Sequence, residues 1–167
     1  LQRLELAFFF DALESEGRIR FRQRAAAATG IVLSPSDLVE DKPGADLLRL
    51  TRGQETDLPA SAKITYIGAS SDYTQAVAES RRLVGVSART ASAALPIVLD
   101  ADQAGAIAES WLLETWVGRE RASFSLPPSH LAVEPGDILD VVDASRTHRV
   151  RITEIGEHGA RPIDARE

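Results

Sequence analysis

Apolar and polar positions alternate along the first part of the chain with the period of two that a β-strand requires. Every second side chain from Leu4 to Phe8 is apolar, which predicts a strand. Gly17 ends a polar turn, and beyond it arginines at positions 18, 20, 22 and 24 alternate with Ile19 and Phe21. A shift of one residue would bury the arginines. The pattern therefore predicts a hairpin with its arginines toward solvent and Ile19 and Phe21 toward the core.

Further short strands are predicted where apolar runs are bounded by turn residues. These runs lie at 31–33, 47–50, 63–67 and 95–99. The segment 76–82 has helix propensity, but it is short and lacks a wide apolar stripe, so we expect it to be extended.

The strongest local signal lies between Asp100 and Gly118. Asp100 can cap the start of a helix, and Gln103 three residues later completes a capping box. Apolar residues then recur on one face of a helix, at Ala104, Ile107, Ala108, Trp111 and Leu112. The pattern predicts an amphipathic helix over about 101–117 with this face buried.

Strand patterns return after the predicted helix. Alternation at 122–126, 138–142 and 148–152 predicts three strands. Between the first two of them, Glu134-Pro135-Gly136-Asp137 carries Pro and Gly at the two central positions of a type II turn.

These elements predict an α+β, β-dominated fold, in which short antiparallel strands form a barrel-like or sandwich-like sheet with one long amphipathic helix packed against it. We expect a single module over 1–167. The polar segment 53–60 is the candidate boundary between a hairpin region (1–58) and the remainder (61–167). The predicted core comprises Phe8, Ile19, Phe21, Tyr66, Ile107, Trp111, Phe124, Leu131, Val133, Ile138 and Val150.

Composition narrows the classes of function. The chain has 167 residues without Cys, which excludes disulfide frameworks, thiolate zinc sites and cysteine nucleophiles. The 25 acidic and 19 basic residues give a formal net charge of −6, which disfavours tight binding to nucleic acid. The first residues lack a signal-peptide pattern, and the apolar runs are too short to span a membrane. Because Met is also absent, we expect the chain to be a piece of a longer polypeptide.

Candidate catalytic groups are few. His130, His148 and His158 are irregularly spaced and no Gly-x-Ser-x-Gly elbow accompanies them, which disfavours a Ser-His-Asp triad. A carboxylate pair such as Asp137 and Asp140 is expected by chance among so many acidic residues. Phosphate-binding glycine motifs are absent from the sequence. The sequence therefore predicts no catalytic, cofactor or metal site and no enzyme activity.

Two features are candidates for a protein interface. Arg18, Arg20, Arg22 and Arg24 form a row that is either a solvated strand face or a subunit contact, since arginine is favoured at interfaces. Trp116 points away from the predicted core face of the helix and belongs either to the core or to a contact.

An ordered set of motifs begins at Ile97. It consists of a strand-to-helix unit at 99–109 with Trp116, the Arg-Glu-Arg strand at 119–127, and the Pro-Gly-Asp turn at 131–137. This succession resembles the phage tail protein domain found in tail hub proteins of long-tailed phages, and most closely the large hub protein of gene transfer agents. Segments 64–67 and 72–73 resemble the preceding strand and loop of that family. The first 60 residues resemble it only through the hairpin at 17–21.

The resemblance implies a structural tail hub or baseplate domain with barrel-like β structure and no catalytic residues. In such hubs three chains form a ring at the tail end, which joins the tail tube and distal tail protein to the tip or fibres. It thus implies a virion protein made in the bacterial cytoplasm, a homotrimer in the full-length protein, and tail and baseplate proteins as partners. A membrane, a specific nucleic acid and a cofactor are not implied.

Two other functions stay open at this point. A carbohydrate- or receptor-binding tail-tip module would need exposed aromatic side chains on loops, for which Tyr73 and Trp116 are the candidates. A tail-associated cell-wall hydrolase would need an acid/base pair, and none stands out in the sequence.

Overall fold

The computed structural model describes residues 2–15, 17–24, 30–83, 85, 87–143, 146–156 and 159–167. The chain forms two compact units, each built from two separate stretches of sequence. Unit 1 comprises Leu1–Phe9 and Gly53–Val117, and unit 2 comprises Phe10–Arg52 and Gly118–Glu167. One of the points where the chain passes between units lies at the start of the polar segment 53–60.

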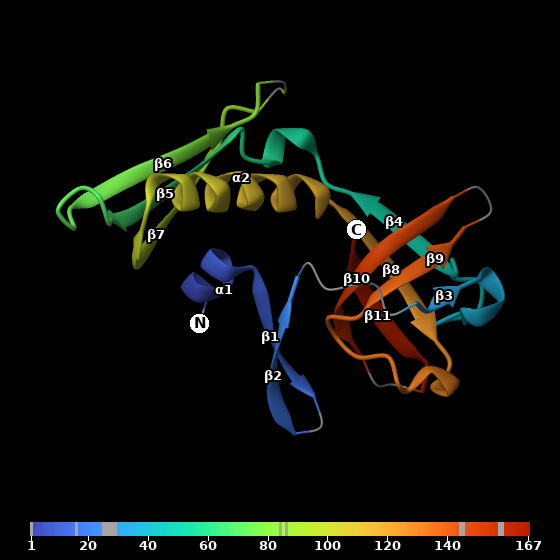
Figure 1. Ribbon diagram of the computed structural model, residues 1–167. Helices are drawn as coiled ribbons and strands as arrows, with labels where there is room; N and C mark the ends of the chain where they lie inside the picture. Colours follow the sequence, from blue (N-terminus) through green and yellow to red (C-terminus); the bar gives the residue numbers. More distant parts are fainter. Residues whose placement is uncertain are drawn as a thin grey trace. The chain divides into compact units, whose positions relative to one another are not determined.

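Unit 1 is a three-stranded sheet with a long helix on one face (Figure 1). Its strand order is β6-β5-β7, with β5 antiparallel to β6 and parallel to β7. The elements are α1 (Gln2–Phe8), the short 3-10 helix η2 (Glu55–Asp57), β5 (Ser61–Gly68), β6 (Gln75–Arg81), β7 (Thr90–Leu99) and α2 (Ala101–Val117). Helix α2 packs on β5 and β6, and α1 contacts β7 and α2.

Helix α2 has the predicted length and the predicted start. The Gln103 N–H donates to Asp100 Oδ1 at 2.7 Å, and the Asp100 N–H donates to Gln103 Oε1 at 3.2 Å. These two reciprocal bonds are the capping box, and they satisfy backbone donors that the first turn leaves without helical partners.

The buried face of α2 is shifted toward the C-terminal tryptophan. Its buried residues are Ala104, Ala108, Leu112 and Trp116, while Ile107 and Trp111 are partly buried. The predicted face was therefore correct for three positions and missed Trp116. The alanines let the helix lie close to β5, whose Ile64 and Tyr66 are buried beneath it.

The predicted strand at the start of the chain is wrong, because Gln2–Phe8 is the helix α1. Its Leu, Glu, Ala and Gln residues have high helix propensity, which outweighs a period-two pattern carried by three apolar side chains. Ala7 is the buried residue of this helix, and Phe8 is exposed rather than part of the core.

Unit 2 is a six-stranded sheet that curls into a half-barrel, together with a separate hairpin (Figure 1). The sheet order is β3-β9-β10-β11-β8-β4; β3 is parallel to β9 and the other pairs are antiparallel. Its elements are β1 (Phe10–Ser15), β2 (Arg18–Gln23), β3 (Val32–Leu33), η1 (Pro35–Asp37), β4 (Leu48–Arg52), β8 (Glu120–Leu126), η3 (Pro128–His130), β9 (Ile138–Val142), β10 (Thr147–Ile155) and β11 (Arg161–Arg166).

The concave face of the curled sheet holds the larger apolar core. It contains Leu33, Leu38, Ala122, Phe124, Leu126, Val133, Leu139, Val141, Val150, Ile152, Ile163 and Ala165. The predicted core positions Tyr66, Phe124, Val133 and Val150 are confirmed, and Ile138 is partly buried. Leu131 is exposed, so its assignment to the core was wrong. The type II turn is confirmed by the φ of +84° at Gly136 and by the Asp137 N–H, which donates to the Glu134 carbonyl at 3.1 Å.

The β1–β2 hairpin has a period-two strand pattern as predicted, but its two faces are reversed. Ile19 and Phe21 are 67% and 64% exposed, so their assignment to the core was wrong. The opposite face, which carries the arginines, meets carboxylates of unit 2 instead. Ion pairing with these carboxylates offsets part of the cost of taking guanidinium groups out of water, so the arginine face is the one that packs.

The described part of the chain is α+β and β-dominated, with a barrel-like sheet and one long helix, as the patterns predicted. None of the described helices is long and apolar enough to cross a membrane.

Candidate functional site

Two of the arginines predicted as interface candidates pair with the Pro-Gly turn of their own unit. The Arg22 guanidinium donates to the Asp137 carboxylate, whose second oxygen accepts the Glu134 N–H at 2.9 Å. A guanidinium nitrogen of Arg20 lies 4.0 Å from a carboxylate oxygen of Glu134. Asp137 is buried, so the Arg22 charge compensates a carboxylate that has little access to water.

The other two arginines of the row differ from each other. Arg24 Nε donates to Asp11 Oδ1 at 2.9 Å, and Arg151 of β10 donates to the second oxygen of the same carboxylate at 3.0 Å. Asp11 thereby joins the hairpin to the curled sheet. Arg18 is exposed near the hairpin turn. Arg22 and Arg24 therefore form ion pairs within unit 2. The exposed Arg18 and Arg20 stay interface candidates.

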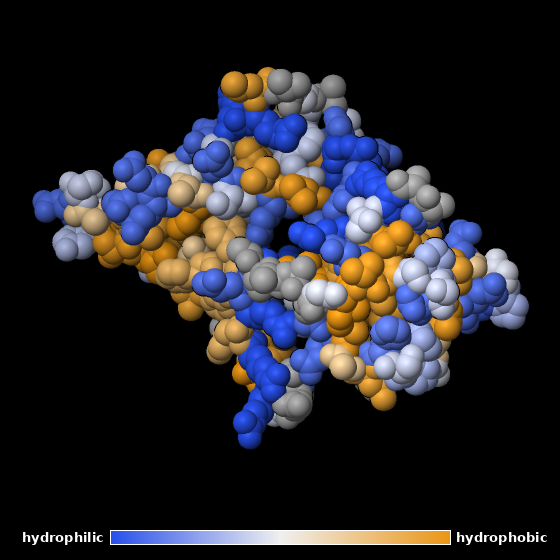
Figure 2. Space-filling model, turned by 45° about the vertical axis from the view of Figure 1, so that its right-hand side comes forward, coloured by the Kyte–Doolittle hydropathy of each residue, from blue (hydrophilic) through white to orange (hydrophobic). Residues whose placement is uncertain are grey.

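The outward face of the hairpin carries apolar side chains together with the polar Glu14 and Gln23. Phe10 and Phe21 meet edge to face, with ring centroids 5.5 Å apart and an interplanar angle of 81°. Ala12 stands opposite Phe21 in the register, so it lies on the same face. Figure 2 shows that apolar side chains also reach the surface over the curled sheet; Leu131 is one of the exposed apolar residues of this unit. Exposed apolar groups gathered in this way are typical of surfaces that bind other proteins.

Trp116 is buried inside unit 1 and has its polar partner there. It is 6% exposed, and its indole N–H donates to the Pro59 carbonyl at 2.8 Å. The Arg82 guanidinium lies 3.8 Å from the centroid of its ring, in cation–π geometry. The side chain therefore fixes the segment after η2 and the end of β6 to helix α2.

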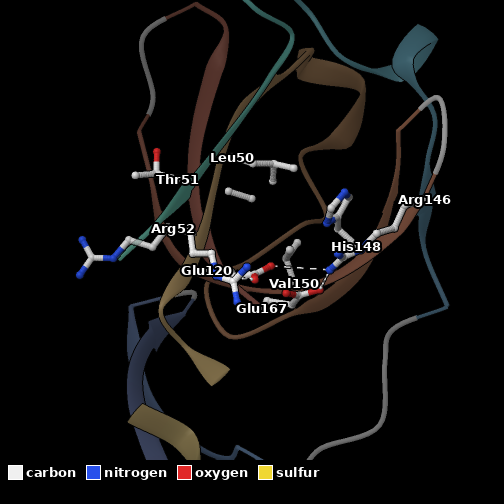
Figure 3. A pocket seen from close by; sticks show the side chains of 10 residues that line it. Leu50, Thr51, Arg52, Glu120, Arg146, His148, Val150 and Glu167 are labelled. Atoms are coloured by element: carbon white, nitrogen blue, oxygen red, sulfur yellow. Dashed lines mark hydrogen bonds and ion pairs between the residues drawn. The ribbon is translucent and has the colours of Figure 1, made fainter. Parts of the chain in front are cut away.

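A cavity of about 240 Å³ opens at one end of the curled sheet of unit 2 (Figure 3). Leu50 of β4 and His148 of β10 point into the same space from opposite strands, and Ala122 and Val150 line it as well. Leu50 lies opposite Ala122 on the inner face of the sheet, yet it is 47% exposed. The interior of a small barrel is normally filled by its own side chains, so this end of the half-barrel is unfilled.

A charged network lies at the mouth of the cavity (Figure 3). Arg146 donates to Glu167 Oε1 at 2.7 Å, and the same nitrogen lies 3.6 Å from Glu120 Oε2. Arg52 Nε lies 3.4 Å from the other Glu120 oxygen. The hydrogen bond of Glu167 with Glu120, and then the contacts with Arg146, hold the pKa of Glu167 below its ordinary value, although burial opposes this. Arg52, Arg121 and Arg146 line this rim with Glu120 and Glu167, so its cations outnumber its carboxylates by one.

His148 is the buried titratable group of the cavity. It is 6% exposed, and among the described residues none forms a hydrogen bond with its imidazole. A buried polar side chain normally finds such a partner. The ring nitrogens are therefore available to whatever enters the cavity.

Of the other two histidines, only His130 lies within the described residues. His130 contributes its backbone carbonyl, which accepts a hydrogen bond from the buried Arg161 at 2.6 Å. His158 lies outside the described residues. Within the described ranges, no group of three or more His, Asp or Glu side chains is placed to hold a metal ion.

Sequence reasoning missed the cavity because its residues come from distant strands. Leu50, Glu120, His148 and Glu167 are brought together only by the sheet order, in which β10, β11, β8 and β4 are neighbours. The sequence around each of these residues does not distinguish it from an ordinary strand position. An inward-facing His in an otherwise apolar alternation at 148–152 is the one local signal.

Comparisons with known proteins give a consistent result. A family model described as "Putative phage tail protein" matches residues 1–155. A chain in the virion of the native gene transfer agent particle is 28% identical, with a TM-score of 0.92 over 99% of this chain. The 43 kDa tail protein of prophage MuSo2 from Shewanella oneidensis is 14% identical, with a TM-score of 0.57 over 98% of this chain. The tail protein from Neisseria meningitidis MC58 is 8% identical, with a TM-score of 0.58 over 96%.

The similarity of this chain to the last two proteins is a similarity of fold alone. The present chain spans 37% of the gene transfer agent protein and 52% of each of the two tail proteins. None of the curated protein sequences matches the chain.

Proposed function

We propose that this chain, which belongs to the phage tail protein family, is a structural part of the tail hub or baseplate of a phage-like particle. In this role it links the tail tube and distal tail protein to the tip or fibres, within a full-length protein that forms a homotrimer. The observation that carries the proposal is the match to the gene transfer agent virion chain over 99% of the present chain.

The surface chemistry of unit 2 supports an assembly role. Ile19 and Phe21 are held in water by a hairpin whose other face is ion-paired to its own unit. An isolated two-stranded hairpin gains little stability from such a face, so the apolar side chains are better explained by a partner that covers them. Neighbouring tail or baseplate proteins are the partners that the proposed role supplies.

The cavity in unit 2 does not favour a cell-wall hydrolase. Glycosidases hold two carboxyl groups several ångströms apart, so that a glycosidic bond or a water can lie between them. The same Arg146 nitrogen lies 3.6 Å from Glu120 and 2.7 Å from Glu167, so a guanidinium occupies the space between the two carboxylates. Their arrangement is that of a structural ion-pair network.

A carbohydrate-binding module is supported less than an assembly role. Of its two candidate aromatic residues, Trp116 is buried in unit 1, where its indole N–H donates to the Pro59 carbonyl. Tyr73 stays exposed, but a single ring is a small platform for a sugar.

The proposal is tested in a host that produces the particle. The gene for the full-length protein is deleted and then supplied as the wild type or as the Ile19→Glu, Phe21→Glu variant. We expect electron micrographs of the deletion strain to show tails that lack a baseplate, or no tails. The double variant should reproduce much of this defect, because its two carboxylates would be buried unpaired at the contact.

A variant with Phe21→Leu, which keeps the face apolar, is the matched control and should assemble normally. Complete, functional tails in the deletion strain would contradict the proposed role. Normal tails with the double variant alone would remove the hairpin face from the contact and leave the role itself standing.

A further inference from the structure

The turn that joins β5 to β6 holds a tyrosine in an unfavourable backbone conformation. The Thr74 N–H donates to the Ser71 carbonyl at 3.0 Å, which closes a four-residue turn. Its two central residues, Asp72 and Tyr73, have φ values of 54° and 56°. Left-handed conformations at both central positions define a type I′ turn, for which Asn-Gly is the preferred sequence. A bulky aromatic residue at the second position is an outlier.

Among the described residues, none forms a side-chain hydrogen bond or ring contact with Tyr73 that would offset this strain. Its side chain is 71% exposed, and two backbone hydrogen bonds hold the turn around it. The Gly68 N–H donates to the Thr74 carbonyl at 2.9 Å, and a side chain at Gly68 would collide with Ser71. An exposed aromatic ring that is held in a strained, hydrogen-bonded turn is explained by a role in binding.

The cavity of unit 2 has the complementary chemistry. Its apolar lining of Leu50, Ala122 and Val150 suits a ring, and the imidazole of His148 lacks a hydrogen-bond partner among the described residues. Its volume of about 240 Å³ exceeds the roughly 150 Å³ of an engineered cavity that binds benzene. It is smaller than typical small-molecule sites of about 300–1,000 Å³. A single aromatic side chain therefore matches it better than a cofactor does.

We propose that Tyr73 of one copy of this chain inserts into the cavity of a second copy. The phenol ring packs against Leu50 and Val150, and its hydroxyl hydrogen-bonds with His148. Asp72, beside Tyr73 on the turn, faces the largely exposed Arg52 at the cavity mouth. The charge of the turn is thus complementary to a cation at the rim, and this pairing favours a second copy over other sources of an aromatic ring.

The contact joins two different surfaces, the turn of unit 1 and the cavity of unit 2. Contacts of this head-to-tail kind build closed rings when the rotation between copies closes. The inference rests on the proposed function, since it names the partner in an assembly role, and it adds the residues through which copies meet.

Sedimentation velocity of the protein across a wide concentration range tests the contact. We expect reversible association that Tyr73→Gly weakens about tenfold or more, as loss of an anchoring aromatic side chain does. The same variant should unfold at a higher temperature, because glycine relieves the strain of the turn. Association lost together with thermal stability gained cannot come from misfolding. Leu131→Ala, which removes another exposed apolar side chain, is the control and should associate like the wild type.

Charge reversal tests the second pair. Asp72→Arg and Arg52→Asp should each weaken association, and the double variant that carries both should restore it. Mixing supplies an independent test, in which Tyr73→Gly is combined with Ala122→Phe, a variant that fills the cavity. At a concentration where the wild type associates, each variant alone should associate much more weakly, and the mixture should give a dimer that grows no further, because one intact turn and one intact cavity remain.

The imidazole resonances of His148 give the direct readout. They should shift as the wild-type protein associates and should not shift in Tyr73→Gly. A wild-type protein that stays monomeric at every concentration would overturn the inference. Association that is unaffected by Tyr73→Gly would overturn it too, even if free p-cresol, used as a probe for a tyrosine ring, bound the cavity. Baseplate defects in the deletion strain together with either of these results would leave the proposed function in place and remove only this contact.

Discussion

Arg22 and Asp137, which are 115 residues apart in the sequence, form an ion pair between the β1–β2 hairpin and the Pro-Gly turn of the curled sheet. The Asp137 side chain is 9% exposed, and its other oxygen accepts the Glu134 N–H. This carboxylate therefore does two things: it shapes the turn, and it holds the arginine face of the hairpin inward.

Arg22→Ala should weaken the attachment of the hairpin. The Arg22 side chain is partly exposed, so we expect a loss of about 1–2 kcal/mol in the free energy of unfolding, less than for a fully buried pair. Urea denaturation measures it. Arg18→Ala, in the same row and exposed, is the matched control and should stay within about 0.5 kcal/mol of the wild type. Equal effects of the two substitutions would contradict the importance of the Asp137 contact.

Trp116 should contribute more stability than Trp111, although the helical pattern placed Trp111, and not Trp116, on the buried face. Trp116→Ala is expected to cost about 3–5 kcal/mol, because it empties a buried site. Trp116→Phe keeps most of the ring but leaves the Pro59 carbonyl without its donor, and should cost about 1–3 kcal/mol. Thermal unfolding of both variants, compared with Trp111→Ala, ranks the two tryptophans. A larger loss for Trp111→Ala would show that the sequence pattern had placed the face correctly.

Local chemistry determined what the sequence could predict. The capping box at Asp100 and Gln103 and the turn at Gly136 involve neighbours in the chain, and both were predicted correctly. The direction of the hairpin faces depends on Asp137, more than a hundred residues away, and was predicted wrongly. The cavity around His148 depends on the strand order, which period-two patterns do not encode.

Two glycines should respond to substitution by alanine in opposite directions. Gly136 has a φ of +84°, and a Cβ there would collide with the end of the Leu13 side chain. Gly136→Ala should therefore cost about 1–2 kcal/mol, through backbone strain and a displaced Leu13. Gly105 lies inside α2, where an added Cβ would meet no other atom within 4 Å. Gly105→Ala should stabilise unit 1 by about 0.5–1 kcal/mol, because alanine restricts the unfolded chain and favours the helix. Differential scanning calorimetry reports both signs, and two shifts of the same sign would contradict this account.

The network at the cavity mouth should make the stability of unit 2 depend on pH in the acidic range. The hydrogen bond with Glu120, followed by the contacts with Arg146, lowers the pKa of Glu167 below its ordinary value of 4.5. A carboxyl group whose pKa is lowered by folding stabilises the folded state fully above that ordinary value, and this stabilisation disappears as the pH falls through the lowered pKa. The melting temperature of the wild type should therefore exceed that of Glu167→Gln near neutral pH, and the difference should shrink below about pH 4.5. Arg146→Gln removes the cation from the same network, so in that background Glu167→Gln should have a smaller effect at every pH. A difference that grew on acidification would mean that Glu167 is held in its neutral form, which is incompatible with a rim built on ion pairs.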